Sequence, residues 1–275
     1  MKRTAYQHFF VQEYPLCHAW MSDHRGKDTV VIFVHGLGGD AISTWQRFPS
    51  LVDDLQDQYP WWRKADLFFY GYRSEGQLPM LAHDLRRFVR RVFPKPDLRL
   101  EMYGAPFRRL SSDLCRLLPP TKYSTLQLVG HSMGGVIIRA MAKDLAVDAS
   151  KAPSSITDAE TCILNRADLR LFAPALFGTR VTGLAGHLLG RGWGDLLGRV
   201  LRPDEYQFIQ DLEDCGELDG LKAESEALFL RNSNHVALTA TSLWGKREQY
   251  LRVSIAGRYA CDQPTQYAEG QDHVS

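Results

Sequence analysis

The fold is decided by residues 126–135, Leu126-Gln127-Leu128-Val129-Gly130-His131-Ser132-Met133-Gly134-Gly135. An apolar segment of strand length leads into a glycine, a serine and two further glycines, and helix-compatible residues follow to Ala140. This order predicts a nucleophile elbow, a strained strand-to-helix turn that lifts a serine Oγ above the end of a sheet. Glycines at 130 and 134 would let the strand and the helix approach closely. An ordinary βα turn is the alternative, and the strand before and helix after favour the elbow.

Strand-like segments alternate with helical patterns along most of the chain. Strands are predicted at 29–34, 65–70, 126–129, 167–173 and 250–256, with one or two short edge strands within 6–21. Helices are predicted at 49–59, 78–93, 111–118, 133–145 and 203–230, with a loop at 147–158. This alternation indicates an α/β fold, a mostly parallel central sheet with helices on both faces. A length of 275 residues predicts a single domain, 1–275.

The overall charge gives no sign of a polyanionic partner. The 33 basic and 32 acidic residues leave a formal net charge of +1, so nucleic-acid binding is not expected. The five cysteines are scattered without metal-ligand spacing, which predicts no metal site and a reducing, cytoplasmic setting. No apolar run is long enough to span a bilayer, and the N-terminal residues lack a signal-peptide pattern.

A second glycine-rich segment, His35-Gly36-Leu37-Gly38-Gly39, follows the buried strand predicted at 29–34. In a nucleophile-elbow enzyme this loop supplies one of the two backbone N–H groups of the oxyanion hole. We expect the amides of Leu37 and Met133 to be those donors. A phosphate-binding loop is the alternative, but no Lys-Ser/Thr pair follows and no complete Gly-x-Gly-x-x-Gly is present. No cofactor is therefore predicted.

A serine hydroxyl needs a base, usually a histidine that a carboxylate orients. His273 is the predicted base because it follows the last predicted strand. His235 precedes that strand and is interpreted as a turn residue, whereas His187 lies in a glycine-rich segment and is the least favoured. His131 adjoins Ser132 and should point away from it.

The carboxylate is expected in the loop that follows the strand predicted at 250–256. Asp262 fits that position and completes a predicted triad of Ser132, Asp262 and His273. Asp272 is a weaker competitor, since a sequence neighbour of the histidine seldom bends back to its Nδ1. A solvated loop aspartate is the alternative interpretation of Asp262.

Glycines alternate with apolar residues at 179–201. Such a segment suits a mobile lid or an acyl-binding wall, since glycines permit hinging and the apolar side chains offer a greasy surface. An irregular core helix is an equally good interpretation of the same pattern.

Together these segments resemble the α/β-hydrolase superfamily, and most of all the lipase-like serine esterases that include GPI-inositol deacylases. The resemblance is carried by residues 31–39, 68–72 and 129–137, and by the terminal Asp272-His273. It implies a serine hydrolase that cleaves an ester, often of a lipid, through an acyl-enzyme. The segment from Pro174 to Thr179 departs from the Thr-Pro-x-x-Gly-Ser-like turn of relatives. The chain stops two residues after His273, where relatives usually continue, which fits the N-terminal part of a longer protein.

The predicted function is therefore carboxylic ester hydrolysis with Ser132 as nucleophile. The predicted partner is a small-molecule or lipid ester, with peripheral membrane contact compatible with the latter. A hydrolase-fold module without turnover and an acyltransferase with the same triad are the alternatives. The sequence does not define the oligomeric state.

Overall fold

A computed structural model describes nine stretches of the chain: 6–11, 16–37, 39–45, 60–73, 76–97, 102–103, 120–176, 216–245 and 259–268. Strands from these stretches form one nine-stranded sheet in the order β5-β1-β2-β4-β3-β6-β7-β8-β9. Six consecutive strands of that order run parallel to one another: β4 (Ala65–Tyr70), β3 (Thr29–Val34), β6 (Thr125–His131), β7 (Ala167–Phe172), β8 (Ala240–Gly245) and β9 (Gln266–Ala268). The predicted α/β-hydrolase fold with a mostly parallel sheet is confirmed.

An antiparallel extension lies beside β4. It consists of β2 (His18–Ser22), β1 (Tyr6–Val11) and the two-residue β5 (Met102–Tyr103). The predicted short strands within 6–21 are therefore present. All parallel strands end at the same edge of the sheet, here called the carboxyl edge, and ligands of open α/β sheets bind at such an edge.

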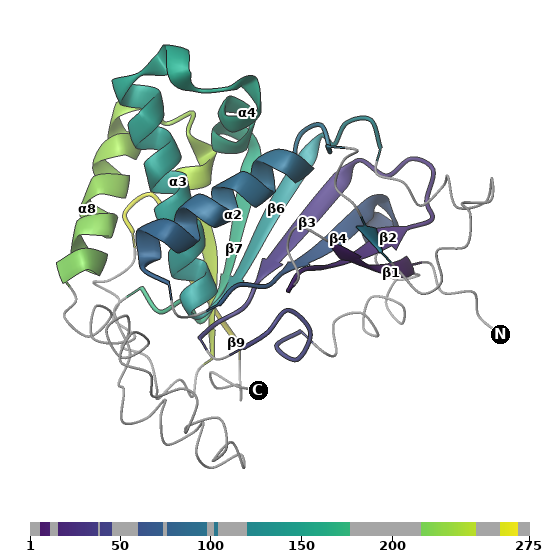
Figure 1. Cartoon of the computed structure of the whole chain (residues 1–275). Helices are drawn as coiled ribbons and strands as arrows, with labels where there is room; N and C mark the ends of the chain where they lie inside the picture. The colour runs from purple at the N-terminus through teal and green to yellow at the C-terminus, as the bar shows by residue number, and fades with distance from the viewer. Residues whose placement is uncertain are drawn as a thin grey trace.

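Four helices cover one face of the sheet (Figure 1). They are α2 (Leu78–Val92), α3 (Met133–Lys151), α4 (Asp158–Arg166) and α8 (Gly216–Arg231). Short 3-10 helices stand at Pro60–Lys64, Pro153–Ser155 and Val236–Leu238. Within the residues that the structure describes, no helix has the length and apolar character needed to cross a membrane.

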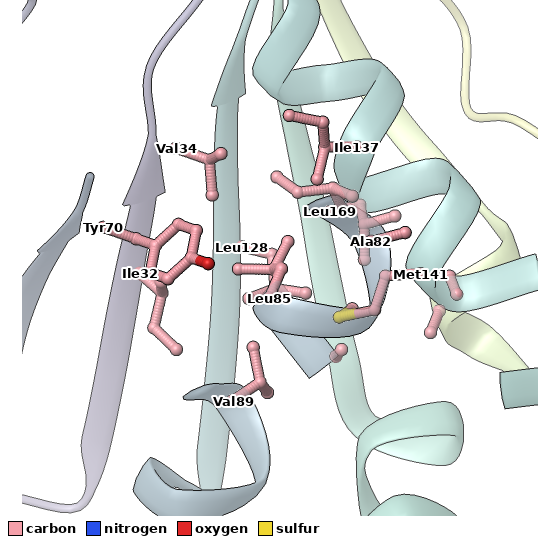
Figure 2. Packing of buried hydrophobic residues seen from close by; sticks show 14 of the residues in the cluster. Ile32, Val34, Tyr70, Ala82, Leu85, Val89, Leu128, Ile137, Met141 and Leu169 are labelled. Carbon is pink, nitrogen blue, oxygen red and sulfur yellow. The ribbon is translucent and has the colours of Figure 1, made fainter. Parts of the chain in front are cut away.

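The larger part of the core lies between this helical layer and the sheet. Leu85 and Val89 of α2 and Ile137 and Met141 of α3 pack over Leu128 at the centre of the sheet (Figure 2). Apolar residues at helical spacing on α2 produce this continuous buried stripe. The core therefore holds α3, which begins directly after Ser132, firmly against the strands.

The opposite face of the central strands is also buried. Phe33 of β3 and Phe69 of β4 stack with ring centroids 4.7 Å apart, and Trp45 packs against Phe33 from the loop after β3. Burial on both faces explains why β3 and β4 read as continuous apolar runs rather than alternating ones.

A buried polar cluster lies near the amino ends of β3 and β4. The Asp66 carboxylate accepts hydrogen bonds from Lys27 Nζ at 2.9 Å, Tyr123 Oη at 2.6 Å and the backbone N–H of Ser22 at 2.8 Å. Burial raises the pKa of Asp66 and lowers the pKa of Lys27, because the interior disfavours the charged form of both groups. This cluster lies at the edge opposite the carboxyl edge.

The structure departs from the predicted elements in the second half of the chain. The loop predicted at 147–158 is wrong at both ends, because α3 continues to Lys151 and α4 begins at Asp158 after a capping box at Thr157. A strand at Ala240–Gly245 was not predicted, and the strand predicted at 250–256 lies outside the described residues. The helices predicted at 49–59 and 111–118, and the candidate lid at 179–201, also fall outside them. The single-domain prediction therefore stays a prediction.

Candidate active site

Ser132 occupies a strained turn between β6 and α3. Its φ is 52° and its ψ is −119°, a combination that residues with a side chain rarely adopt. The residue is buried, with 4% of its surface exposed. Strain of this kind persists only where the surrounding structure enforces it, and here β6 and α3 hold both ends of the turn. This conformation is the one expected of a nucleophile elbow.

The glycines of the elbow are required by close backbone approach. A Cβ atom at Gly134 would lie 2.3 Å from the carbonyl oxygen of Val34, and one at Gly130 would lie 2.7 Å from the backbone nitrogen of Gly135. Neither contact is tolerated, so only glycine fits at these two positions. The sequence prediction for Gly130 and Gly134 rested on the same physical reason.

Backbone hydrogen bonds connect Ser132 to the neighbouring strand. Its N–H donates to the carbonyl oxygen of Phe172 at the end of β7, over 3.0 Å. Its own carbonyl oxygen accepts from the N–H groups of Gly135 and Ala175, at 3.1 and 3.2 Å. Bonds on both sides of the residue fix the direction of its Cα–Cβ bond relative to the sheet.

The loop after β3 lies directly against the elbow. A Cβ atom at Gly36 would come within 2.9 Å of Ser132 Cβ, so the absence of a side chain at Gly36 lets this loop reach the serine. The adjacent ring of His35 is buried and stacks on Tyr72, with ring centroids 4.2 Å apart. The structure thus brings together the two glycine segments that the sequence singled out.

His35 fixes the orientation of the peptide that carries the Leu37 amide. Its Nε2 accepts from the N–H of Tyr72 at 3.3 Å, so Nδ1 carries the proton and donates to the carbonyl oxygen of Gly36 at 2.8 Å. The N–H of Gly39 donates to that same oxygen at 3.1 Å. In a trans peptide the C=O and the following N–H point in opposite directions, so the Leu37 N–H is directed away from His35.

Burial lowers the pKa of His35, which keeps the ring neutral near pH 7. A neutral ring is required here, because Nε2 must remain an acceptor for the N–H of Tyr72. From the sequence, His35 is only a member of the glycine-rich loop and has no predicted role of its own. Its position between a buried strand and a glycine was the available signal.

Met133 is the first residue of α3, so its N–H has no partner within the helix. The positive end of the helix dipole also lies at this point, directly beside Ser132. Two groups suited to an oxyanion, the amides of Leu37 and Met133, therefore belong to segments that meet at the serine.

The predicted base, His273, and the candidate lid lie outside the described residues. The strand before His273 is described: β9 pairs in parallel with β8, and it ends at Ala268. The chain consequently leaves β9 at the carboxyl edge, which is the edge that holds Ser132. The role of His273 stays a prediction.

Asp262 lies away from Ser132. Its Oδ1 accepts from the N–H of Ala240 at 2.9 Å, and Ala240 is level with Leu128 through the register of β6, β7 and β8. Leu128 precedes Ser132 by four residues, which is about 13 Å along a strand. Both Asp262 oxygens also lie 2.5 Å from Nη2 of Arg139. These contacts do not support the predicted orienting role, which stays a prediction.

Two other histidines that the sequence analysis weighed, His235 and His131, occupy structural positions. His235 precedes Ala240 at the amino end of β8 and accepts a hydrogen bond from Asn232 Nδ2 at 2.9 Å. The ring of His131 packs edge-on to Trp45, with centroids 6.3 Å apart. Across the described stretches, no three His, Cys, Asp or Glu side chains are grouped as metal ligands.

Comparison with known proteins identifies the family. The model of the alpha/beta hydrolase family matches residues 31–266, which include both glycine segments and extend to Gln266, the first residue of β9. This chain belongs to the α/β hydrolase family. The match concerns the α/β hydrolase family as a whole, so the narrower resemblance to GPI-inositol deacylases stays a prediction. No curated protein matches the chain.

Several solved esterase and lipase structures are similar to this chain. Esterase B from Lactobacillus rhamnosis is 14% identical with a TM-score of 0.49, over 89% of this chain and 67% of its own. Bacillus licheniformis lipase BlEst2 is 15% identical with a TM-score of 0.45, over 92% and 87%. Phospholipase PlaB from Legionella pneumophila is 18% identical with a TM-score of 0.45, over 80% of this chain. The present chain spans only 38% of the length of that phospholipase.

Proposed function

We propose that this α/β hydrolase cleaves carboxylic esters through an acyl-enzyme on Ser132. The observation that carries the proposal is the backbone of Ser132, a non-glycine residue held at φ 52° between β6 and α3. A turn without chemistry would be made at lower cost by glycine. Family membership supports the same conclusion.

In the proposed reaction Ser132 Oγ attacks the ester carbonyl as its proton passes to the base. The negative charge on the former carbonyl oxygen is held by the N–H groups of Leu37 and Met133, each worth about 3 kcal/mol in the transition state. Collapse of the tetrahedral intermediate breaks the ester C–O bond, and the alcohol leaves with the proton from the base. Water then enters by the same route, releases the acid and regenerates Ser132.

His273 is the proposed base. It follows β9 along the chain, and β9 ends at the carboxyl edge. Nucleophile, acid and histidine occur in that order in this fold. Asp262 is the carboxylate that the sequence predicts, and Glu248 is a second candidate, because it comes three residues after β8 ends at the same edge.

Replacement of Ser132 by alanine tests the proposal. Hydrolysis of p-nitrophenyl butyrate should fall by about 10⁶-fold in kcat, to the background rate, since the nucleophile is lost. A fluorophosphonate probe should label the unmodified protein and not Ser132→Ala. An unlabelled wild-type protein would instead favour the hydrolase-fold module without turnover.

The base and the carboxylate are assigned by a matched set of variants. His273→Ala should lose nearly all activity, whereas His235→Ala should retain it, because His235 lies at the amino end of β8. Glu248→Gln compared with Asp262→Asn separates the two carboxylates. A His235→Ala variant that alone loses activity would contradict the assignment of the base.

A substrate screen would show which acyl chain lengths the protein prefers. Lipid esters are the proposed substrates on the strength of the apolar, glycine-rich segment 179–201, a lid candidate by sequence. Esters of increasing acyl length should show a rise in kcat/KM with length if that segment covers an acyl chain. The same assay in the presence of an alcohol detects acyl transfer as a transesterified product.

A further inference from the structure

We propose that Arg139 and Asp262 form a clamp that positions the chain running through β9 to His273 relative to the helix that begins at Ser132. The clamp consists of these two side chains and the two backbone groups they hold, Leu238 C=O and Ala240 N–H. The inference rests on the proposed function, since it assigns to Arg139 and Asp262 a positioning role in that reaction.

Arg139 is buried within the helical layer. Only 1% of the residue is exposed, and it stands on α3 seven residues after Ser132, about 10 Å along the helix axis. Its Nη2 pairs with both oxygens of Asp262, and its Nη1 donates to the carbonyl oxygen of Leu238 at 2.7 Å. One guanidinium thus joins α3 to two segments that are distant in sequence.

Asp262 completes the connection from the other side. Its Oδ1 accepts from the N–H of Ala240, and the N–H of the next residue, Gln263, donates to the carbonyl oxygen of Ala240 at 3.0 Å. The ring of Tyr259 lies under the guanidinium of Arg139, with Cζ 4.3 Å from its centroid. The segment that leads into β9 is therefore fixed to the start of β8.

These contacts set where the chain leaves β9. Only three residues separate Asp262 from Gln266, the first residue of β9. With Asp262 held against Ala240 and Arg139, the register Leu243↔Gln266 places the end of β9 at a defined height on the sheet. His273 follows that end by five residues, so a shift at Asp262 would displace the base relative to Ser132.

Stability alone is a weak reason for such a pair. A buried ion pair can often be replaced by apolar side chains of similar volume with no loss of stability. The planar guanidinium of Arg139 instead contacts Asp262 through Nη2 and Leu238 C=O through Nη1, so two separate attachments fix its orientation as well as its distance. Orientation is the property that a base must have relative to a nucleophile.

The test compares single and double variants by melting temperature and by kinetics with p-nitrophenyl butyrate, well below each melting temperature. Asp262→Asn and Arg139→Met should each lower Tm by about 10 °C, because each leaves a buried charge without its partner. The double variant Arg139→Met/Asp262→Leu should regain most of that Tm. Its kcat should nevertheless stay about 10²-fold low with KM little changed, since the base is no longer positioned.

Arg139→Lys keeps the test decisive if the double variant does not fold. Lysine preserves the charge for Asp262, but its single nitrogen cannot hold both Asp262 and Leu238 C=O as the two guanidinium nitrogens do, so kcat should fall about tenfold. Arg170→Met is the control, because Arg170 forms an exposed ion pair with Asp168 on β7. That variant should change neither Tm nor kcat.

Three outcomes would overturn the clamp. A double variant with wild-type Tm and wild-type kcat would show that the pair is only structural, and so would Arg139→Lys with wild-type kcat. The third outcome is that Asp262→Asn loses about 10⁴-fold in kcat at unchanged Tm while Arg139→Met stays fully active. Asp262 would then be the triad carboxylate. Failure of the proposed function is separate, because wild-type protein would then resist the fluorophosphonate probe.

Discussion

Gly134 shows how little space the elbow leaves around Ser132. A Cβ atom there would meet the carbonyl oxygens of Val34 and His35 at 2.3 and 2.5 Å, and both are backbone atoms that cannot rotate away. The first turn of α3 is thereby pressed onto the end of β3. The position of the Met133 amide depends on that contact.

Gly134→Ala should move the start of α3 and disrupt the site. We expect a loss of about 2 kcal/mol in the free energy of unfolding, measured in urea, and a fall in kcat of about 10²-fold. Gly220→Ala is the control, because a Cβ atom there meets nothing within 4 Å. The free energy of unfolding of this variant should rise by about 0.5 kcal/mol. Equal behaviour of the two variants would contradict the packing argument.

Residues whose role follows from local geometry could be predicted from the sequence. Ser132, Gly130, Gly134 and Gly36 belong to short segments in which a strand, a turn and a helix follow one another. The position of Asp262 could not be predicted in this way. It depends on which stretch forms the strand before it: the structure has a strand at 240–245, which was not predicted, and the predicted strand at 250–256 lies outside the described residues.

Among the elements, α4 illustrates a helix that the sequence signals and the prediction missed. Thr157 accepts a hydrogen bond from the N–H of Glu160, and the Glu160 carboxylate accepts in return from the N–H of Thr157, at 3.0 Å. Glu160 Oε1 also accepts a hydrogen bond from Nε of Arg86 on α2, at 2.8 Å. One capping residue therefore supports the contact between two helices.

Thr157→Ala should lower the free energy of unfolding by about 1 kcal/mol through loss of the cap. Esterase activity should be unchanged, because α4 lies away from the carboxyl edge. Thr161→Ala, one turn further along the same helix, should cause no such loss, since alanine is the better helix former. Urea unfolding of the two variants measures their free energies of unfolding. Equal losses in Thr157→Ala and Thr161→Ala would rule out a role for the capping box.

Elements with a clear apolar pattern could be predicted. The continuous apolar runs at 29–34 and 65–70 match β3 and β4, and the helical spacing of apolar residues at 78–93 matches α2 closely. β8 escaped prediction because its small and hydroxyl-bearing residues, Ala240 to Ser242, lack the apolar run of a buried strand. Its place in the sheet is decided by β7 and β9 on either side, which is tertiary information.

At the scale of the whole molecule, a buried ion pair and the proposed active site lie at opposite edges of the sheet. The Lys27–Asp66 pair, 2.9 Å apart, is buried near the amino ends, whereas Ser132 and the loop after β3 lie at the carboxyl edge. Substitution of Lys27 or Asp66 should therefore affect unfolding with little effect on catalysis.

Lys27→Met should destabilise the protein by about 3 kcal/mol at pH 8, because it leaves the Asp66 carboxylate buried without its cation. The pKa of Asp66 is raised by burial, and loss of Lys27 removes a group that lowers it. A carboxyl group with a higher pKa in the folded state binds protons more readily when folded, so the deficit should shrink as pH falls toward 5. Urea unfolding at both pH values measures this, and an equal deficit would contradict it.

The backbone of Ser132 has a consequence for the balance between stability and activity. A side chain at φ 52° and ψ −119° costs of order 1 kcal/mol, and glycine does not incur that cost. Ser132→Gly should therefore yield a protein that is more stable and inactive, with a higher Tm than Ser132→Ala. The fold would be improved by removing its own nucleophile, so optimisation of this scaffold for stability alone would select against the residue on which its proposed chemistry depends.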